Sequence, residues 1–84
     1  MVEHYVYLAE RFLAQVEQTF IDLTEHKEMG AALTLRDARL AGLRKWRVKD
    51  FEKFLVFYLP RSNGVSIVRV LHAAQNWWAK LGVI

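Results

Sequence analysis

Cleavage of RNA is one chemistry for which this chain carries side chains of the right type. That reaction needs a group that takes the 2′-hydroxyl proton, a cation that stabilises the crowded phosphate and an acid for the leaving oxygen. The candidates are His72, Arg69, Tyr58, Lys45, Arg47 and Lys49. Beyond His72 the chain reads Ala73-Ala74-Gln75, which adds no cation. We therefore expect no catalysis, and expect His72 to be a hydrogen-bonded structural group. Were RNA cleaved, His72, Arg69 and Tyr58 would carry the reaction.

Binding of an acidic partner is the second possibility. Lys45, Arg47 and Lys49 are spaced two apart, which puts them on one face of a strand. That face is either the solvated side of a sheet or a surface offered to a partner. Trp77 and Trp78 are adjacent, so one can stay partly exposed, and tryptophan is a favoured interface anchor; packing in the core or in a dimer is the alternative. The candidate partner-binding set is Lys45, Arg47, Lys49, Arg69, His72, Trp77 and Trp78.

Composition excludes several other classes of protein. The chain has no Cys and its three His are far apart, so we predict no metal site and no cofactor. No phosphate-binding Gly loop occurs, and no apolar run reaches the roughly 18 residues of a membrane span. The N-terminus carries acidic residues and no basic leader, which predicts a cytoplasmic protein. A net charge of +3 suits nucleic acid or an acidic protein, but we predict no sequence-specific DNA binding.

The first element that must position these side chains is a long helix over residues 2–29. This segment contains no Gly or Pro and is rich in helix formers. His26 and Lys27 would lie in its last turn, with Gly30 as the C-cap. Its apolar residues are spaced alternately four and three apart, which is a heptad pattern; they are Val2, Val6, Ala9, Leu13, Val16, Phe20 and Leu23.

The remainder of the chain favours three strands. Residues 31–41 predict a loop with a short turn. Three segments have strand patterns: residues 43–48 alternate, residues 54–59 form a continuous apolar run, and residues 65–72 form a returning run. Together they predict an antiparallel meander, with Asn63-Gly64 in its second turn. Trp46 should face the core, opposite Lys45, Arg47 and Lys49. Residues 73–81 are either a short helix or a tail. The fold class is therefore α+β, with a long N-terminal helix packed on a three-stranded antiparallel meander in one domain over residues 1–84.

Three runs of sequence carry a resemblance to a known family. Residues 42–49 (GLRKWRVK) with Phe51, 54–58 (FLVFY) and 67–72 (IVRVLH) are similar to the G-L-R-x-W-x-V, F-L-I/V-F-Y and I-x-R-V-L-H strands of ParE-like toxins. Residues 11–30 resemble the second helix of that family. The chain thus resembles the RelE/ParE toxin superfamily, in its ParE branch, over residues 11–78.

The chain departs from the pattern of that family at two places. Family members usually begin with a strand and a first helix, whereas residues 2–10 here look like the end of that helix, joined to the second without a turn. After His72 many relatives read Gly-Ala-Arg-Asp, where this chain reads Ala73-Ala74-Gln75-Asn76. The Arg and Asp charges are therefore absent.

The resemblance implies the toxin of a bacterial type II toxin–antitoxin pair, of a kind associated with plasmid stabilisation. Its target would be DNA gyrase, and a cognate antitoxin would neutralise it by covering the groove between helix and sheet. Two alternatives stay open. One is a ribosome-dependent mRNA endoribonuclease, as in the RelE branch, and the other is a non-toxic member that only binds antitoxin.

The uninterrupted helix also predicts a homodimer. A small sheet can cover only part of a helix of about 40 Å, so a contiguous apolar patch would meet water unless a second chain covers it. The alternative is a monomer with a frayed first turn or two. The predicted dimer residues are Val2, Tyr5, Val6, Leu8, Ala9 and Leu13.

Overall fold

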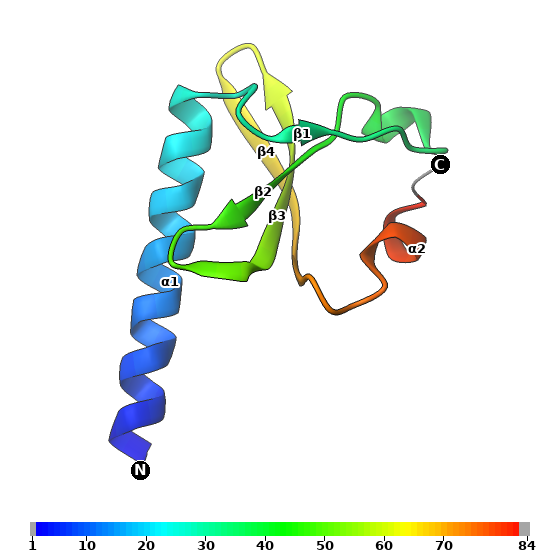
Figure 1. The fold of residues 1–84 in the computed structure, drawn as a ribbon. Helices are drawn as coiled ribbons and strands as arrows, with labels where there is room; N and C mark the ends of the chain where they lie inside the picture. Colours follow the sequence, from blue (N-terminus) through cyan, green and yellow to red (C-terminus); the bar gives the residue numbers. More distant parts are fainter. Residues whose placement is uncertain (1, 83–84) are drawn as a thin grey trace.

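One long helix lies against a twisted antiparallel sheet in the computed structural model, which describes residues 2–82 (Figure 1). The elements are α1 (Val2–Glu25), β1 (Ala31–Ala32), the 3₁₀ helix η1 (Ala38–Leu40), β2 (Arg44–Val48), β3 (Phe51–Arg61), β4 (Gly64–His72) and α2 (Trp77–Leu81). The sheet order is β1-β2-β3-β4, so consecutive strands are neighbours. The predicted α+β fold is confirmed. The sheet has a fourth strand because Ala31 and Ala32 pair with Lys45 and Arg44.

Helix α1 ends four residues before the predicted boundary, because the residues after Glu25 are held by the sheet. The Tyr58 hydroxyl donates to the carbonyl oxygen of Lys27 (2.7 Å) and accepts from the backbone N–H of Gly30 (2.9 Å). The Arg44 guanidinium donates to the carbonyl oxygen of Gly30 (2.6 Å). The prediction of Gly30 as a helix cap was wrong. A Cβ at Gly30 would lie 2.6 Å from the Tyr58 hydroxyl oxygen, so glycine is needed here for close approach.

The face of the sheet that α1 covers carries the first apolar core, which we call the helix-side core. Its buried members are Leu23, Val48, Val56 and Tyr58. Trp46 packs against them but stays half-buried, which confirms that it points to the core face. The buried Thr19 hydroxyl accepts a hydrogen bond from the backbone N–H of Lys49 (2.9 Å) and so ties α1 to the β2–β3 turn.

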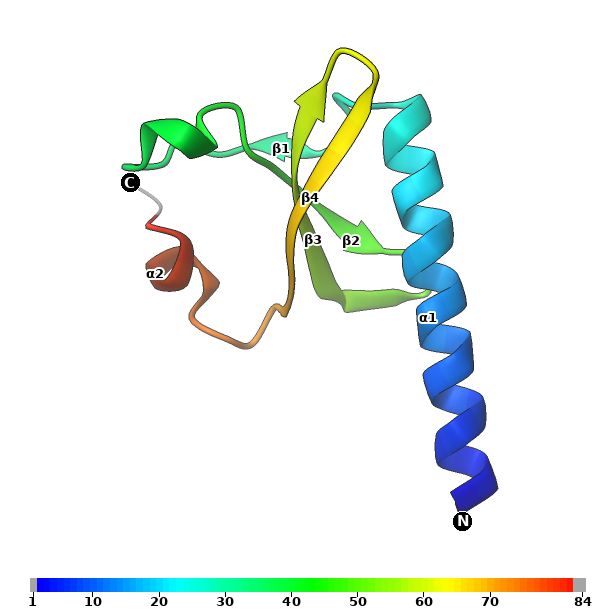
Figure 2. The same cartoon turned by 180° about the vertical axis from the view of Figure 1, so that it is seen from behind.

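The opposite face carries a second cluster, the far-side core, with Leu43, Phe57, Leu59 and Leu71 buried. Two segments on the side of the sheet away from α1 cover it, namely the loop that contains η1 and the C-terminal helix α2 (Figure 2). Partly buried side chains from these segments pack against the cluster; they are Leu33, Leu35, Leu40, Trp77 and Leu81. Of the two alternatives for this face, the solvated side of a sheet therefore applies only to part of it, since much of the face is a core of its own.

The turn between β2 and β3 changes the predicted basic row. Strand β2 ends at Val48, and Lys49 and Asp50 form the turn, with Asp50 in the left-handed region at φ 62°. Lys49 is thus not a member of a row on the strand. A bulge between Arg47 and Val48 adds to this break in the alternation.

Candidate functional site

A short cationic row crosses the far face of the sheet. Lys45 on β2, Phe57 on β3 and Arg69 on β4 are paired neighbours in the register, so their side chains share that face. Phe57 is buried beneath the row, Lys45 is half-buried and Arg69 is exposed. Two positive charges therefore flank a buried ring on this face.

Helix α2 places two indole rings beside this row. The Trp77 ring lies 5.5 Å from the Phe57 ring and 5.3 Å from the Lys45 ammonium nitrogen, which is within cation–π range. The Trp78 ring meets the Trp77 ring edge to face at 5.5 Å, and Trp78 is 52% exposed. One tryptophan thus covers the far-side core and the other faces solvent, as their adjacency predicted. We call Lys45, Arg69, Trp77 and Trp78 the cation–tryptophan patch.

Of the other predicted partner-binding residues, Arg47 lines a hollow together with Lys45, while Lys49 and His72 lie apart from the patch. Arg47 is exposed and turns its guanidinium over the Trp46 ring, at 4.5 Å from the centroid. Lys49 stands in the β2–β3 turn against α1. His72 belongs to the helix-side face, since it pairs with Phe54 across the strands. Four of the seven predicted residues are therefore brought together.

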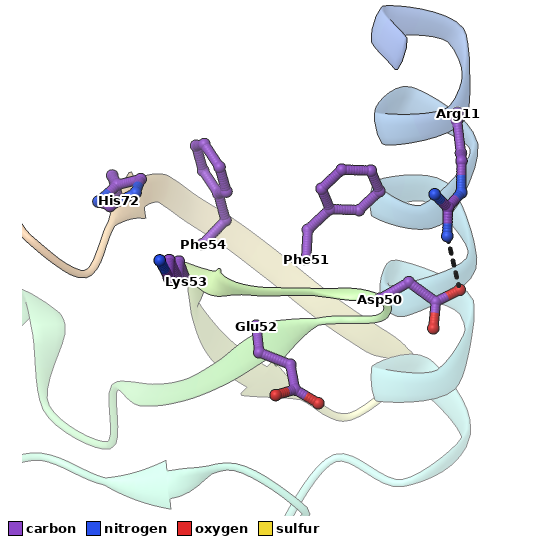
Figure 3. A pocket seen from close by; sticks show the side chains of 7 residues that line it. All are labelled: Arg11, Asp50, Phe51, Glu52, Lys53, Phe54 and His72. Atoms are coloured by element: carbon purple, nitrogen blue, oxygen red, sulfur yellow. Dashed lines mark ion pairs between the residues drawn. The ribbon is translucent and has the colours of Figure 1, made fainter. Parts of the chain in front are cut away.

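A second candidate site, not expected from sequence, is a hollow at the end of the sheet near α1 (Figure 3). Arg11 of α1 forms an ion pair with Asp50 at 3.9 Å, and its guanidinium lies 5.4 Å from the Phe51 ring centroid. Phe51, Phe54 and His72 stand side by side on the face toward α1, while Glu52 points to the other side of its strand (Figure 3). In the sequence, the polar pair Lys49-Asp50 between two apolar strands is the signal that could have indicated the β2–β3 turn, which contributes Asp50 to this hollow.

Aromatic contacts join the two ends of this hollow. The Phe12 ring of α1 meets the Phe51 and Phe54 rings edge to face, at 5.1 and 4.8 Å. The Phe54 ring meets the His72 ring at 4.9 Å. His72 is also tied to its own loop, because its Nδ1 accepts a hydrogen bond from the backbone N–H of Ala74 (3.0 Å). One nitrogen of this imidazole is thus already engaged.

The three residues that could have cleaved RNA do not converge. Tyr58 is completely buried, with its hydroxyl engaged by Lys27 and Gly30. Arg69 points to the far face, whereas His72 lies on the helix-side face. A proton acceptor, a phosphate-binding cation and an acid must all lie within reach of one phosphate. This arrangement does not provide that geometry.

The charged loop before β2 has a local role. The Arg39 guanidinium donates to both carboxylate oxygens of Asp37, at 3.1 and 2.9 Å. The hydrogen bond from Arg39 holds the pKa of the Asp37 carboxyl below its ordinary value. The backbone N–H of Arg36 donates to the carbonyl oxygen of Gly82 (3.1 Å), so this loop anchors the C-terminal segment.

Helix α1 extends beyond the sheet toward its N-terminus (Figure 1). Of the predicted dimer residues, Leu8, Ala9 and Leu13 are exposed. The other three, Val2, Tyr5 and Val6, are outside the set of residues whose side chains the structure describes. Leu13 is 64% exposed and Leu8 is 37% exposed. These values place Leu13, more than Leu8, on the solvent side of the helix.

Metal binding and membrane crossing are two further possibilities. Among residues 7–82, whose side chains are described, no group of three or more potential metal-ligating side chains occurs. No helix within residues 2–82 has the length and apolar character that a membrane crossing needs.

Comparison with known proteins gives one match. A family model described as the ParE toxin of type II toxin–antitoxin system, parDE, matches residues 1–77 of the 84-residue chain. None of the curated proteins and none of the solved structures matches the chain.

Proposed function

The chain belongs to the ParE toxin family of type II toxin–antitoxin systems, and from this premise we propose that it inhibits DNA gyrase by binding it rather than by cleaving RNA. Membership of the family also implies an antitoxin partner. The observation that supports a binding mechanism most is the buried Tyr58 hydroxyl, which has a donor and an acceptor already in place. With Arg69 on the opposite face from His72, these two residues and Tyr58 do not form one compact acid–base site.

The cation–tryptophan patch is the surface that we propose for contact with the target. Arg and Trp are enriched among residues that dominate binding energies at protein interfaces. Arg69 and Trp78 are both exposed, while the half-buried Lys45 is held against Trp77, which fixes its charge in place. Such a surface suits an acidic or aromatic region of a partner.

The hollow of Figure 3 is the surface that we propose for the cognate antitoxin. It lies in the groove between α1 and the sheet, where its floor is aromatic and its rim carries Arg11 and Lys53. An antitoxin segment would place an apolar side chain on Phe51 and Phe54 and an acidic one near Lys53, since Arg11 already pairs with Asp50.

Induced expression in a bacterium tests the proposed target. We expect filamentous cells and a DNA-damage response, and, with purified gyrase, an accumulation of cleaved DNA. Messenger 5′ ends should show no codon-specific cuts. Translation arrest with cuts that disappear in His72→Ala or Arg69→Ala would establish an endoribonuclease instead. Growth without either response, in a strain where the chain still binds its antitoxin, would identify a non-toxic member.

We also propose a homodimer through the turns of α1 that project beyond the sheet. The exposed side chains of Tyr7, Leu8 and Ala9 support it, because water contact with such a patch is unfavourable. Light scattering should give twice the mass of one chain at micromolar concentration, and Leu8→Lys should shift the mass toward that of one chain. A wild-type mass of one chain at the highest soluble concentration would contradict the homodimer.

A further inference from the structure

The connection between β4 and α2 is closed by the side chain of its first residue. His72 is the last residue of β4 and stands beside Phe54 (Figure 3). Its Nδ1 accepts a hydrogen bond from the backbone N–H of Ala74 (3.0 Å), and its own backbone N–H donates to the side-chain oxygen of Gln75 (3.0 Å). The backbone N–H of Gln75 donates to the carbonyl oxygen of His72 (3.0 Å). These bonds fold residues 72–75 into one turn, which we call the 72–75 turn.

This turn determines where α2 begins. The backbone N–H of Trp77, the first residue of α2, donates to the carbonyl oxygen of Gln75 (2.7 Å). Asn76, at the N-cap, forms no side-chain cap hydrogen bond. The start of the helix is therefore held by the 72–75 turn. The turn thus also determines where the Trp77 ring meets Phe57 and where Trp78 meets Trp77.

The imidazole of His72 closes the turn in one charge state only. Nδ1 accepts a hydrogen bond only while it carries no proton, so the neutral ring has its proton on Nε2. In the protonated ring, the N–H at Nδ1 and the N–H of Ala74 are two donors that face each other. Histidine is the side chain that ordinarily changes charge between about pH 5 and pH 8. A fall in pH therefore removes the acceptor that the turn uses.

The surroundings of the imidazole do not hold it in either charge state. His72 is half-buried and lines the open hollow of Figure 3, and its ring meets the Phe54 ring of β3 edge to face at 4.9 Å. The charged groups that line this hollow come from three elements; they are Arg11 of α1, Asp50 of the β2–β3 turn, and Glu52 and Lys53 of β3. Two positive and two negative charges therefore balance around the ring.

We propose that His72 is a pH-responsive positioning residue for the two tryptophans of α2. The neutral imidazole closes the 72–75 turn and holds Trp77 on Phe57. The protonated imidazole opens the turn and lets α2 move off the far-side core, so that Trp78 loses its fixed place. The consequence for target binding rests on the proposed function of the cation–tryptophan patch, whereas the response of the turn itself does not.

NMR spectroscopy of the full chain tests the turn without any partner. Protection of the Ala74 amide is its exchange rate relative to that of an unstructured peptide at the same pH. This protection should fall about three- to tenfold from about pH 8 to about pH 5, which is the factor that one hydrogen bond contributes. Nuclear Overhauser contacts between the Trp77 and Phe57 rings should weaken with it.

Two amide variants separate the acceptor from its charge. His72→Asn keeps an acceptor oxygen near the place of Nδ1 and takes up no proton, so the protection of Ala74 should be the same at both pH values. His72→Gln has its amide one carbon further out, near the place of Nε2, so the turn should be open at both. His26→Asn is the matched control, because it removes an exposed histidine beyond the end of α1 and should respond to pH as the wild type does.

Purified gyrase and the same variants test the consequence for binding. The ratio of wild-type affinity to His72→Asn affinity should fall about three- to tenfold between about pH 8 and pH 6, and this ratio cancels any titration of gyrase itself. His72→Gln should bind more weakly than His72→Asn at both pH values. A side chain with a merely structural role would leave the ratio constant.

Two results would overturn the positioning role. One is protection of Ala74 in the wild type that does not change with pH, and the other is an equal loss of protection in His72→Asn, which would assign the change to another group. A constant affinity ratio, while Arg69→Ala/Trp78→Ala loses affinity, would overturn the role in target binding. If the turn responds to pH but that double variant binds gyrase as the wild type does, His72 positions α2 and the proposed target surface is wrong.

Discussion

Replacing Tyr58 with Phe should lower the free energy of unfolding by about 2 to 4 kcal/mol. The change removes one hydroxyl that serves two backbone groups, the N–H of Gly30 and the carbonyl oxygen of Lys27. Tyr58 is completely buried, so the N–H of Gly30 would be left unpaired in a site that water does not readily reach. Each buried polar group that loses its partner costs about 1 to 3 kcal/mol.

Urea denaturation of the purified variant measures this cost. Tyr7→Phe is the matched control, since Tyr7 is 62% exposed and its change should alter the free energy by less than about 0.5 kcal/mol. If Tyr58→Phe were as stable as the wild type, the hydroxyl would not hold the connection after α1. If the wild-type protein cleaved RNA and Tyr58→Phe lost this activity without losing stability, Tyr58 would instead have a catalytic role.

The elements with strong periodicity could be predicted from sequence. The helix begins where the heptad pattern begins, and each predicted strand overlaps an observed one. Alternation also placed Trp46 on the core face. These features are local, because each follows from which side chains a helix or strand turns to the same side. Their ends were less accurate, since α1 ends where Tyr58 takes hold of Lys27.

The far-side core could not be predicted, because it depends on contacts between distant segments. Leu33, Leu35 and Leu40 lie in a stretch with no clear period, and their partners are on β3, β4 and α2. Backbone contacts bring that stretch over the sheet: β1 pairs with β2, the N–H of Leu33 donates to the carbonyl oxygen of Leu43, and the N–H of Arg36 donates to the carbonyl oxygen of Gly82. A row of charges on the neighbouring strand therefore seemed to mark a solvated face.

Part of the candidate site could be predicted, and part could not. The residue types and the exposure of one of two adjacent tryptophans followed from the sequence. The meeting of Lys45, Phe57 and Arg69 depends on strand register, which the sequence left open. Arg47 was assigned to the same row, but its guanidinium folds over Trp46, a choice that alternation does not decide.

The largest functional effect should come from the double variant Arg69→Ala/Trp78→Ala. We expect its affinity for gyrase to fall about 1,000-fold, because interface residues of this kind can each contribute about 2 kcal/mol and 1.4 kcal/mol is a factor of ten. Arg69 is exposed, so its replacement should change the free energy of unfolding by less than about 0.5 kcal/mol, whereas loss of the ring contact between Trp78 and Trp77 should lower it by about 0.5 to 1.5 kcal/mol. Inhibition of growth should disappear while the amount of folded protein stays the same.

Surface plasmon resonance with purified gyrase, beside a titration of DNA cleavage, measures the effect. The control is Arg61→Ala/Ile21→Ala, which also removes one exposed arginine and one large apolar side chain; Ile21 and Trp78 are each 52% exposed. Arg61 lies at the β3–β4 turn and Ile21 on α1, both apart from the patch. Equal affinity of the test and wild-type proteins would contradict the patch as the target surface. Equal losses in test and control would show that the effect is not specific to it.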